Sequence, residues 1–181
     1  MFDYWLWDSV LPKWFCEEQI KNTDWAAKIK GHVNLNDDLV VDENKRITDV
    51  VWIDQSSPIG CISQIYVNMA NEKANWNFNL SNAEKIQIGK YDSSTQGFYD
   101  WHSDDGYKPK ENGLLRKLSV SILLNEDFEG GLFEFKNFEK QPILKQGSII
   151  VFPSFLEHRV APVTEGIRYS AVTWVSGPAY R

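Results

Sequence analysis

Histidine is rare in this chain, at three in 181 residues, and two of the three stand where they could bind a metal. His102 and Asp104 are separated by one residue, so on a β-strand both side chains point to the same face. His158 lies in a later segment that an antiparallel pairing could place opposite them. Two histidines and one carboxylate form the facial triad that binds Fe(II) and leaves positions open. A His-x-Asp pair alone is more often structural, and the third residue is what favours a metal site.

Arg168 suggests a second binding function. It follows His158 by ten positions, on the next predicted strand, among apolar residues such as Ile167, Ala171 and Val172. Most arginines form surface ion pairs, but a guanidinium in an apolar strand can hold a carboxylate through two parallel hydrogen bonds. We therefore expect Arg168 to bind an anion beside the metal.

Short strands would have to position these residues, and the second half of the chain has the pattern of such strands. Residues 118–123 alternate between two sets of side chains, as in a strand with two different faces. Glycines such as Gly130 and Gly147 mark breaks between segments. Eight strands are predicted, at 84–92, 98–104, 116–124, 131–136, 141–145, 148–153, 156–162 and 167–176. This number of short strands is typical of a jelly roll, two packed sheets closed at one end.

The chain up to about residue 75 is predicted to be mostly helical. One helix is expected between Pro12 and Gly31, and a second begins with Ser57 as its N-cap and Pro58 as its first residue. The second helix would have one apolar face, made of Ile59, Ile62, Ile65, Tyr66 and Met69. Residues 50–53 are predicted to form a strand between the helices.

The predicted fold class is therefore α+β, mainly β: a double-stranded β-helix, or jelly roll, of about eight strands supported by N-terminal helices. We expect a single domain over residues 1–181, with helical support in 1–75 and the catalytic core in 76–181. Hydrophobic residues make up 43% of the chain, enough for a sizeable core.

Composition also limits the function classes. The formal net charge of −6 argues against a protein whose main task is to neutralise nucleic-acid phosphate. No apolar run approaches the roughly 18 residues of a membrane span, and Asp3 stands where a signal peptide would be positive. The two cysteines do not make a disulfide framework. We expect a cytoplasmic protein that has neither a membrane nor a nucleic acid as partner.

The order and spacing of several segments resemble a known family. These segments are Tyr91 and residues 97–104, 116–125, 127–131, 147–153 and 158–174. Together they resemble the iron(II)/2-oxoglutarate dioxygenases of the prolyl 4-hydroxylase type, over about residues 76–177. The N-terminal helices are compatible with the family's supporting helices but carry no signature.

The resemblance implies a role for each candidate residue. His102, Asp104 and His158 would bind Fe(II), and Arg168 would hold the distal carboxylate of the co-substrate 2-oxoglutarate. Two tyrosines also match: Tyr91 a family residue that lines the co-substrate pocket, and Tyr99 another position near the site. Dioxygen would be the second co-substrate, and ascorbate is a further cofactor that the resemblance allows. The reaction would hydroxylate an unactivated C–H bond and release succinate and CO2.

One position departs from the family pattern. Several prolyl hydroxylases have a tyrosine at the position of Leu123, and its hydroxyl helps to hold the distal carboxylate. Leu123 has no such hydroxyl. Ser121, Ser170 and Thr173 are the candidates to replace it, depending on which face of its strand each one occupies.

Three functions compete for this set of residues. The first is hydroxylation of a prolyl residue in a peptide or protein, and the second is oxidation of a free amino acid or another small metabolite. The third is a non-enzymatic jelly-roll module such as a metal sensor or a lectin, which the complete triad with Arg168 disfavours. A nucleic-acid demethylase of the same superfamily is also disfavoured, because Trp174 stands where that subfamily has a second arginine. An open groove beside residues 104–113 would favour a peptide, and a closed pocket a metabolite.

Other residues have plainer interpretations. His32 follows the predicted end of the first helix and is expected to be an ordinary surface residue. Trp101 and Trp174 flank the candidate site and either wall the pocket or belong to the core. A basic group is expected in a solvated loop, with attraction of an acidic substrate as the alternative; it consists of Lys108, Lys110, Arg116 and Lys117.

Overall fold

Two antiparallel β-sheets make up most of the computed structural model, which describes residues 2–35, 38–105 and 113–179. In the described residues, the larger sheet contains nine strands. Seven follow one another in space in the order β1 (Trp5–Trp7), β13 (Ile149–Pro153), β10 (Leu114–Leu123), β15 (Val163–Pro178), β8 (Ile86–Asp92), β6 (Asp49–Ile53) and β2 (Ile29–Lys30). The other two, β7 (Asn82–Ala83) and β11 (Phe128–Gly130), pair with β15.

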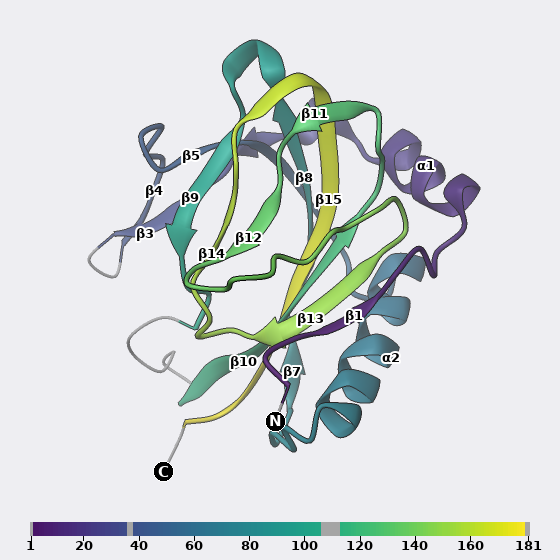
Figure 1. The fold of residues 1–181 in the computed structure, drawn as a ribbon, viewed down its shortest axis with the longest axis vertical. Helices are drawn as coiled ribbons and strands as arrows, with labels where there is room; N and C mark the ends of the chain where they lie inside the picture. The colour runs from purple at the N-terminus through teal and green to yellow at the C-terminus, as the bar shows by residue number, and fades with distance from the viewer. Residues whose placement is uncertain (1, 36–37, 106–112, 180–181) are drawn as a thin grey trace.

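The smaller sheet lies against one face of the larger one. Its strands are β12 (Phe133–Phe135), β14 (His158–Val160), β9 (Phe98–His102) and β5 (Arg46–Ile47). A separate hairpin is formed by β3 (Val33–Leu35) and β4 (Asp38–Val40). Figure 1 shows β9, β12 and β14 on one side of β15 and both helices, α1 (Lys13–Asn22) and α2 (Pro58–Lys73), on the other. The arrangement confirms the predicted jelly roll with supporting helices.

The alternation in β10 explains how one strand serves both layers. Leu118, Val120 and Ile122 have no exposed surface and belong to the core cluster that includes Ile59 and Val67 of α2. The residues between them point to the other face, toward the smaller sheet. The main core therefore lies between the larger sheet and the helices, and the space between the sheets is left for other side chains.

Helix α2 begins where the sequence predicts. The hydroxyl of Ser57 accepts a hydrogen bond from the Gly60 backbone N–H at 3.3 Å, and Pro58 opens the first turn. The predicted apolar face is wrong in part, because Ile65 is 57% exposed. The buried side chains follow a different stripe, made of Ile59, Ser63, Val67 and Ala70.

The first 75 residues contain less helix than expected. Helix α1 ends at Asn22, because Thr23 takes an extended backbone and its hydroxyl donates to the Gln19 carbonyl at 2.7 Å. A short 3-10 helix follows (Trp25–Ala27), and Ile29–Lys30 is strand β2. The expected helix up to Gly31 is therefore wrong beyond Asn22. The predicted strand at 50–53 is confirmed as part of β6.

Seven of the eight predicted strands in the second half are present, and the one at 141–145 is not. Pro142 has no backbone N–H to donate to a sheet. The side chain of Gln141 instead exchanges two hydrogen bonds with the backbone of Phe135, at 2.7 and 2.9 Å. Seven strands have no counterpart among the predictions: β1, β2, β3, β4, β5, β7 and β11.

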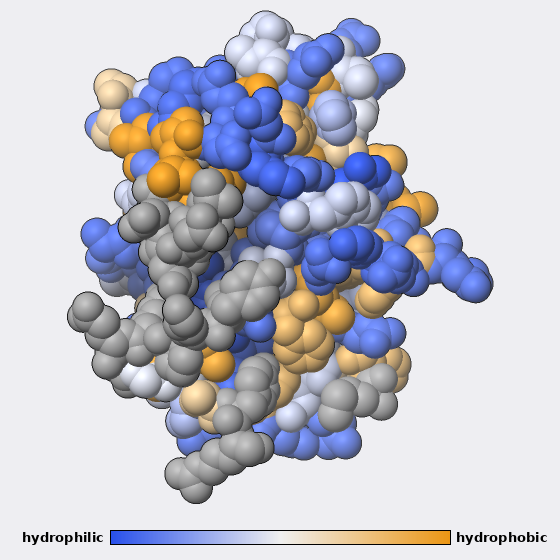
Figure 2. Space-filling view, turned by 90° about the vertical axis from the view of Figure 1, so that its left-hand side faces the viewer, coloured by the Kyte–Doolittle hydropathy of each residue, from blue (hydrophilic) through white to orange (hydrophobic). Residues whose placement is uncertain are grey.

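The outer surface agrees with a sandwich whose apolar side chains lie between its layers. The face in Figure 2 is mainly hydrophilic, with hydrophobic residues in a few small groups. Among the described residues, no helix is long and apolar enough to cross a membrane.

Candidate active site

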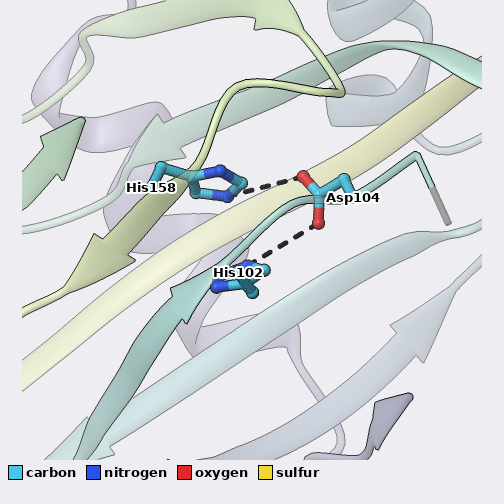
Figure 3. Close-up of side chains that lie close together, drawn as sticks. All are labelled: His102, Asp104 and His158. Atoms are coloured by element: carbon cyan, nitrogen blue, oxygen red, sulfur yellow. Dashed lines mark ion pairs between the residues drawn. The ribbon is translucent and has the colours of Figure 1, made fainter. Parts of the chain in front are cut away.

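The three candidate metal ligands converge between the two sheets. Strands β9 and β14 pair with His102 directly opposite His158, as an antiparallel pairing was expected to place them. The Nε2 atom of His158 lies 3.5 Å from Oδ2 of Asp104, and Nε2 of His102 lies 3.7 Å from Oδ1 (Figure 3). One ligand atom from each residue lies within 4.8 Å of the other two. A single ion could contact all three side chains.

Asp104 reaches this position by a different route from the one predicted. Strand β9 ends at His102, so the argument that both residues share the face of one strand is wrong. The chain bends after His102, and the Asp104 backbone N–H donates to the Ser154 carbonyl at 2.8 Å. A backbone contact with the end of β13 therefore places Asp104.

Both imidazole rings are oriented by backbone carbonyls. Nδ1 of His102 lies 2.7 Å from the Asp100 carbonyl oxygen, and Nδ1 of His158 lies 2.9 Å from that of Leu156. A carbonyl oxygen only accepts, so we assign the proton to Nδ1 in each ring. The Nε2 lone pairs then face Asp104, in the arrangement that protein-bound metals use.

The protonation states also suit a metal. Burial and, to a lesser extent, the neighbouring His158 together lower the pKa of His102 to about 3. Burial by itself would raise the pKa of Asp104, but His158, His102, Arg116 and the Ser119 hydroxyl outweigh it and lower the pKa to about 2. A neutral imidazole and an ionised carboxylate are the forms that bind a cation.

Arg168 lies deep in the molecule with an unmatched charge. Its side chain is 1% exposed, and within the described ranges its Nε and Nη1 atoms have no hydrogen-bond partner. It stands opposite Tyr91 in the pairing of β15 with β8, with its guanidinium carbon 5.4 Å from the centre of the Tyr91 ring. A buried cation without an anion is costly. The site is therefore complementary to an anionic ligand.

A pocket between the sheets contains the triad and extends along the same face of β15 as Arg168. Its polar lining includes Tyr91 and Tyr99, and its apolar walls come from both sheets: Phe133, Phe152, Val160, Val172 and Trp174. Tyr99 stacks on the His102 ring, with 3.5 Å between ring centres. Burial raises the pKa of Tyr99 to about 12, so the phenol stays neutral.

The strand faces narrow the choice of hydroxyl that replaces the family tyrosine. Ser121 and Ser170 line the pocket, and Ser170 pairs directly with Leu123. Thr173 lies opposite Val120 on the helix-facing side, where its hydroxyl donates to the Glu84 carbonyl at 2.9 Å. Of the three candidates, Thr173 is therefore excluded by position.

Sequence reasoning missed Arg46 and Gln87, which also line the pocket. Arg46 is 6% exposed, donates to Oε1 of Gln87 at 2.5 Å and to the His32 carbonyl at 3.1 Å, and lies 4.5 Å from the Tyr99 ring. Strand β5, which carries Arg46, is distant in sequence from the triad, so no spacing could have indicated it. The side chain of His32 is exposed, as expected, and its backbone holds Arg46.

The structure agrees with some of the remaining expectations and differs from others. Trp174 lines the pocket, whereas Trp101 lies against Arg159, 4.6 Å from its guanidinium carbon. Arg116 is not part of a solvated loop: it lies in β10, pairs with Glu84 through two contacts of 2.7 Å and covers the Trp174 ring. Lys117 is 3% exposed. Lys108 and Lys110 lie outside the described residues.

Comparison with known proteins gives a consistent result. The family model of the 2OG-Fe(II) oxygenase superfamily matches residues 86–176, just over half of the chain. A PKHD-type hydroxylase of Synechococcus sp. is 38% identical over 82 residues, covering 42% of this chain and 37% of that protein. A PKHD-type hydroxylase of Idiomarina loihiensis is 34% identical over 105 residues, covering 54% of this chain and 46% of that protein. The chain thus matches less than half the length of these curated relatives.

Solved structures resemble the whole chain. The viral collagen prolyl hydroxylase of Paramecium Bursaria Chlorella virus-1 has a TM-score of 0.73 at 18% identity, covering 97% of both chains. A prolyl-4-hydroxylase of Pseudomonas putida also has a TM-score of 0.73 at 18% identity, covering 98% of this chain and 94% of that one. At this identity the likeness shows the jelly-roll fold.

Proposed function

The chain belongs to the 2OG-Fe(II) oxygenase superfamily, and on that premise we propose that it hydroxylates a prolyl residue of a peptide or protein with Fe(II), 2-oxoglutarate and dioxygen. One observation carries the proposal: a metal-competent triad and an unmatched buried guanidinium line the same inner face of one sandwich. A lone triad would also suit a metal sensor, and a lone buried arginine would suit many anion sites. Together they match a cation and a dicarboxylate co-substrate.

The residues present fit an Fe(II) ion. His102 and His158 would bind it through Nε2 and Asp104 through its carboxylate, because the Nδ1 protons are already used by backbone carbonyls. The bound metal supplies the oxidation chemistry that couples dioxygen and 2-oxoglutarate to C–H hydroxylation. The protein supplies orientation and a pocket whose walls include the rings of Phe133 and Phe152.

The residues present also fit 2-oxoglutarate. Arg168 would hold the distal carboxylate, because its Nε and Nη1 atoms have no partner among the described residues and its guanidinium therefore has donors free for an anion. Ser170 lies two residues along β15 on the same face, and Ser121 lies on β10 across from Val172. Either hydroxyl would supply the contact that Leu123 cannot make. Tyr91, directly opposite Arg168, would close the pocket beside the chain of the co-substrate.

A prolyl substrate is supported by the character of the relatives. The curated relatives are named as PKHD-type hydroxylases and the two similar structures as prolyl hydroxylases. A further neighbour from Trichoplax adhaerens is a prolyl hydroxylase in complex with a peptide fragment, at a TM-score of 0.67. Trp174 and Tyr99 offer aromatic walls against which a pyrrolidine ring can pack.

A free amino acid is the second candidate, and Arg46 is the observation that favours it. This guanidinium lines the pocket beside Gln87, which pairs with Val172, four residues along β15 from Arg168. A second cation could hold the carboxylate of a small substrate, whereas a peptide would present a carbonyl.

The test is a screen of proline-containing peptides and free amino acids with the iron-loaded protein. We expect succinate release that depends on iron and substrate, and a product 16 Da heavier than a peptide substrate, because one oxygen atom is inserted. The His158→Ala protein is the matched control and should give none. Hydroxylation of free amino acids alone would replace the prolyl proposal, and an iron-loaded protein that neither binds nor consumes 2-oxoglutarate would refute both. Stimulation by ascorbate can be measured in the same reactions.

A further inference from the structure

Two fully buried serines form a hydrogen-bonded chain that ends on Asp104. The Ser119 hydroxyl lies 2.7 Å from Oδ2 of Asp104, and the Ser154 hydroxyl lies 2.9 Å from that of Ser119. Both serines have 0% exposure. An ionised carboxylate can only accept, so Ser119 donates to Asp104 and its own oxygen accepts from Ser154. The chain therefore has one direction, from Ser154 through Ser119 to the carboxylate.

Asp104 has a greater need of such support than either histidine. His102 and His158 lie on paired strands and opposite each other, and a backbone carbonyl orients each ring. Asp104 lies on the bend beyond β9, where no strand pairing holds it. Its backbone N–H donates to the Ser154 carbonyl, so Ser154 contacts both the backbone of Asp104 and, through Ser119, its side chain.

We propose that Ser119 and Ser154 are positioning residues that fix the rotation of the Asp104 carboxylate and so preorganise the metal site. The inference rests on the proposed function, because it assigns the triad to a metal. Ser119 holds Oδ2, which limits the carboxylate to one orientation between the two imidazoles. Without the hydroxyl, the carboxylate could rotate toward the positive charge of Arg116, whose Nη1 atom already lies 3.4 Å from the Asp104 carbonyl.

The strength of the Ser154–Ser119–Asp104 hydrogen bonds sets the expected loss of metal affinity. A hydrogen bond to a charged oxygen is stronger than one between neutral groups, and a second donor polarises the first. Loss of a residue that orients a metal ligand typically costs about ten- to a hundredfold in metal affinity. We expect that loss for Ser119→Ala. Ser154→Ala leaves the direct donor in place, so its loss of affinity should be smaller, at most about fivefold, because a second bond strengthens the first by roughly 10–30%.

The experiment measures Mn2+ binding by the metal-free protein from the electron paramagnetic resonance signal of the free ion. The variants are Ser119→Ala, Ser154→Ala and the double variant, with Ser63→Ala as the matched control. Ser63 is also a buried serine, at 1% exposure, and its hydroxyl donates to the Ile59 carbonyl at 2.7 Å in α2, outside the site. The visible absorption of bound Co2+ reports the ligand geometry, and thermal unfolding of the metal-free proteins reports stability.

The proposal expects weaker Mn2+ binding and an altered Co2+ band in Ser119→Ala, with no greater loss of thermal stability than in Ser63→Ala. It also expects Ser154→Ala to weaken binding in the wild-type background but to add little to Ser119→Ala, because its contact passes through Ser119. Unchanged Mn2+ affinity in either single variant overturns the proposal, and Ser154→Ala alone decides if Ser119→Ala does not fold. Failure of the wild-type protein to bind Mn2+ at all would instead refute the proposed function.

Discussion

Along β10 and β15, the two faces of the larger sheet have different characters, although the same strands carry both. On β10, Leu118, Val120 and Ile122 pack with α2 in an apolar core, while Ser119 and Ser121 face the smaller sheet. β15 repeats the pattern, with Ala171 and Val175 in the core and Ser170, Val172 and Trp174 at the pocket. Successive residues of a strand point to opposite faces, so a residue that packs in the core and a residue that lines the pocket can be immediate neighbours in sequence.

The difference has an energetic meaning. The helix-facing side gains free energy from the burial of apolar surface, at about 25 cal/mol per Å². The pocket side contains Arg168, a buried charge with unpartnered donors, which is a local cost that functional sites commonly carry. The helix-facing core must offset that cost, so substitutions on the two faces should have separable effects.

Loss of a triad histidine should have the largest effect on the function of the pocket side of the sheet. His158→Ala or His102→Ala should reduce turnover of 2-oxoglutarate to background, because each removes one of three ligands, and should weaken iron binding. The main core between the larger sheet and the helices contains neither histidine, although His158 packs against Phe133 and Phe152, so the fold should persist in circular dichroism. Turnover near the wild-type rate in either purified variant would show that the triad is wrongly assigned.

A large-to-small substitution on the helix-facing side should have the opposite effect: it should lower stability and leave ligand binding intact. Leu118→Ala removes a side chain with no exposure and should lower the free energy of unfolding by about 2–5 kcal/mol. The molecules that stay folded should bind 2-oxoglutarate with near-normal affinity. Urea unfolding and a 2-oxoglutarate titration of the same preparation measure both quantities. A variant with normal stability and poor binding would contradict the separation of the two faces.

Arg168→Ala should affect binding but not stability. We expect a ten- to hundredfold loss of 2-oxoglutarate affinity, since a charge-assisted contact is worth about 1.5–3 kcal/mol. Stability should be unchanged or higher, because an unmatched buried charge is removed. The measurement is a titration of 2-oxoglutarate into anaerobic iron-loaded protein, followed by its charge-transfer absorption band. Arg168→Lys should recover part of the loss, and unchanged affinity in Arg168→Ala would remove 2-oxoglutarate from the assignment while leaving the triad.

A matched pair of smaller substitutions compares the two faces directly. Ser121→Ala should weaken 2-oxoglutarate binding about twofold to tenfold, the effect of one hydrogen bond. Thr173→Val keeps the shape of its side chain on the other face, so the affinity should not change although the contact with the Glu84 carbonyl is lost. The same titration measures both variants. Equal losses in the two would mean that the strand faces do not decide access to the pocket.

The smallest effect is expected for the third histidine. His32→Ala should leave activity and iron binding unchanged, because its side chain is exposed and only its backbone carbonyl contacts Arg46. The measurement is iron affinity by equilibrium dialysis, made on this variant and on the triad variants side by side. A large loss would mean that the wrong histidines have been chosen.

Local patterns made much of the fold predictable. Alternation over residues 118–123 and the Ser57-Pro58 helix start depend on neighbours in the sequence, and both are confirmed. The expected helix up to Gly31 and the strand at 141–145 failed because side chains of Thr23 and Gln141 take backbone hydrogen bonds that regular structure would have used. Such competition depends on where the chain lies in three dimensions, so periodicity does not reveal it.

The candidate site, too, was predictable from the sequence only in part. Residue types and spacing alone selected His102, Asp104, His158 and Arg168 as candidates, because the chemistry of a metal and of a carboxylate restricts which side chains can serve. Only the tertiary structure decided that Ser121 and Ser170 face the pocket and Thr173 does not, and that Arg46 enters it. Alternation shows that a strand has two faces, but which face is inward depends on pairing register between segments far apart in the chain. The bend that brings Asp104 to the histidines has the same origin, a contact with Ser154 that no local pattern encodes.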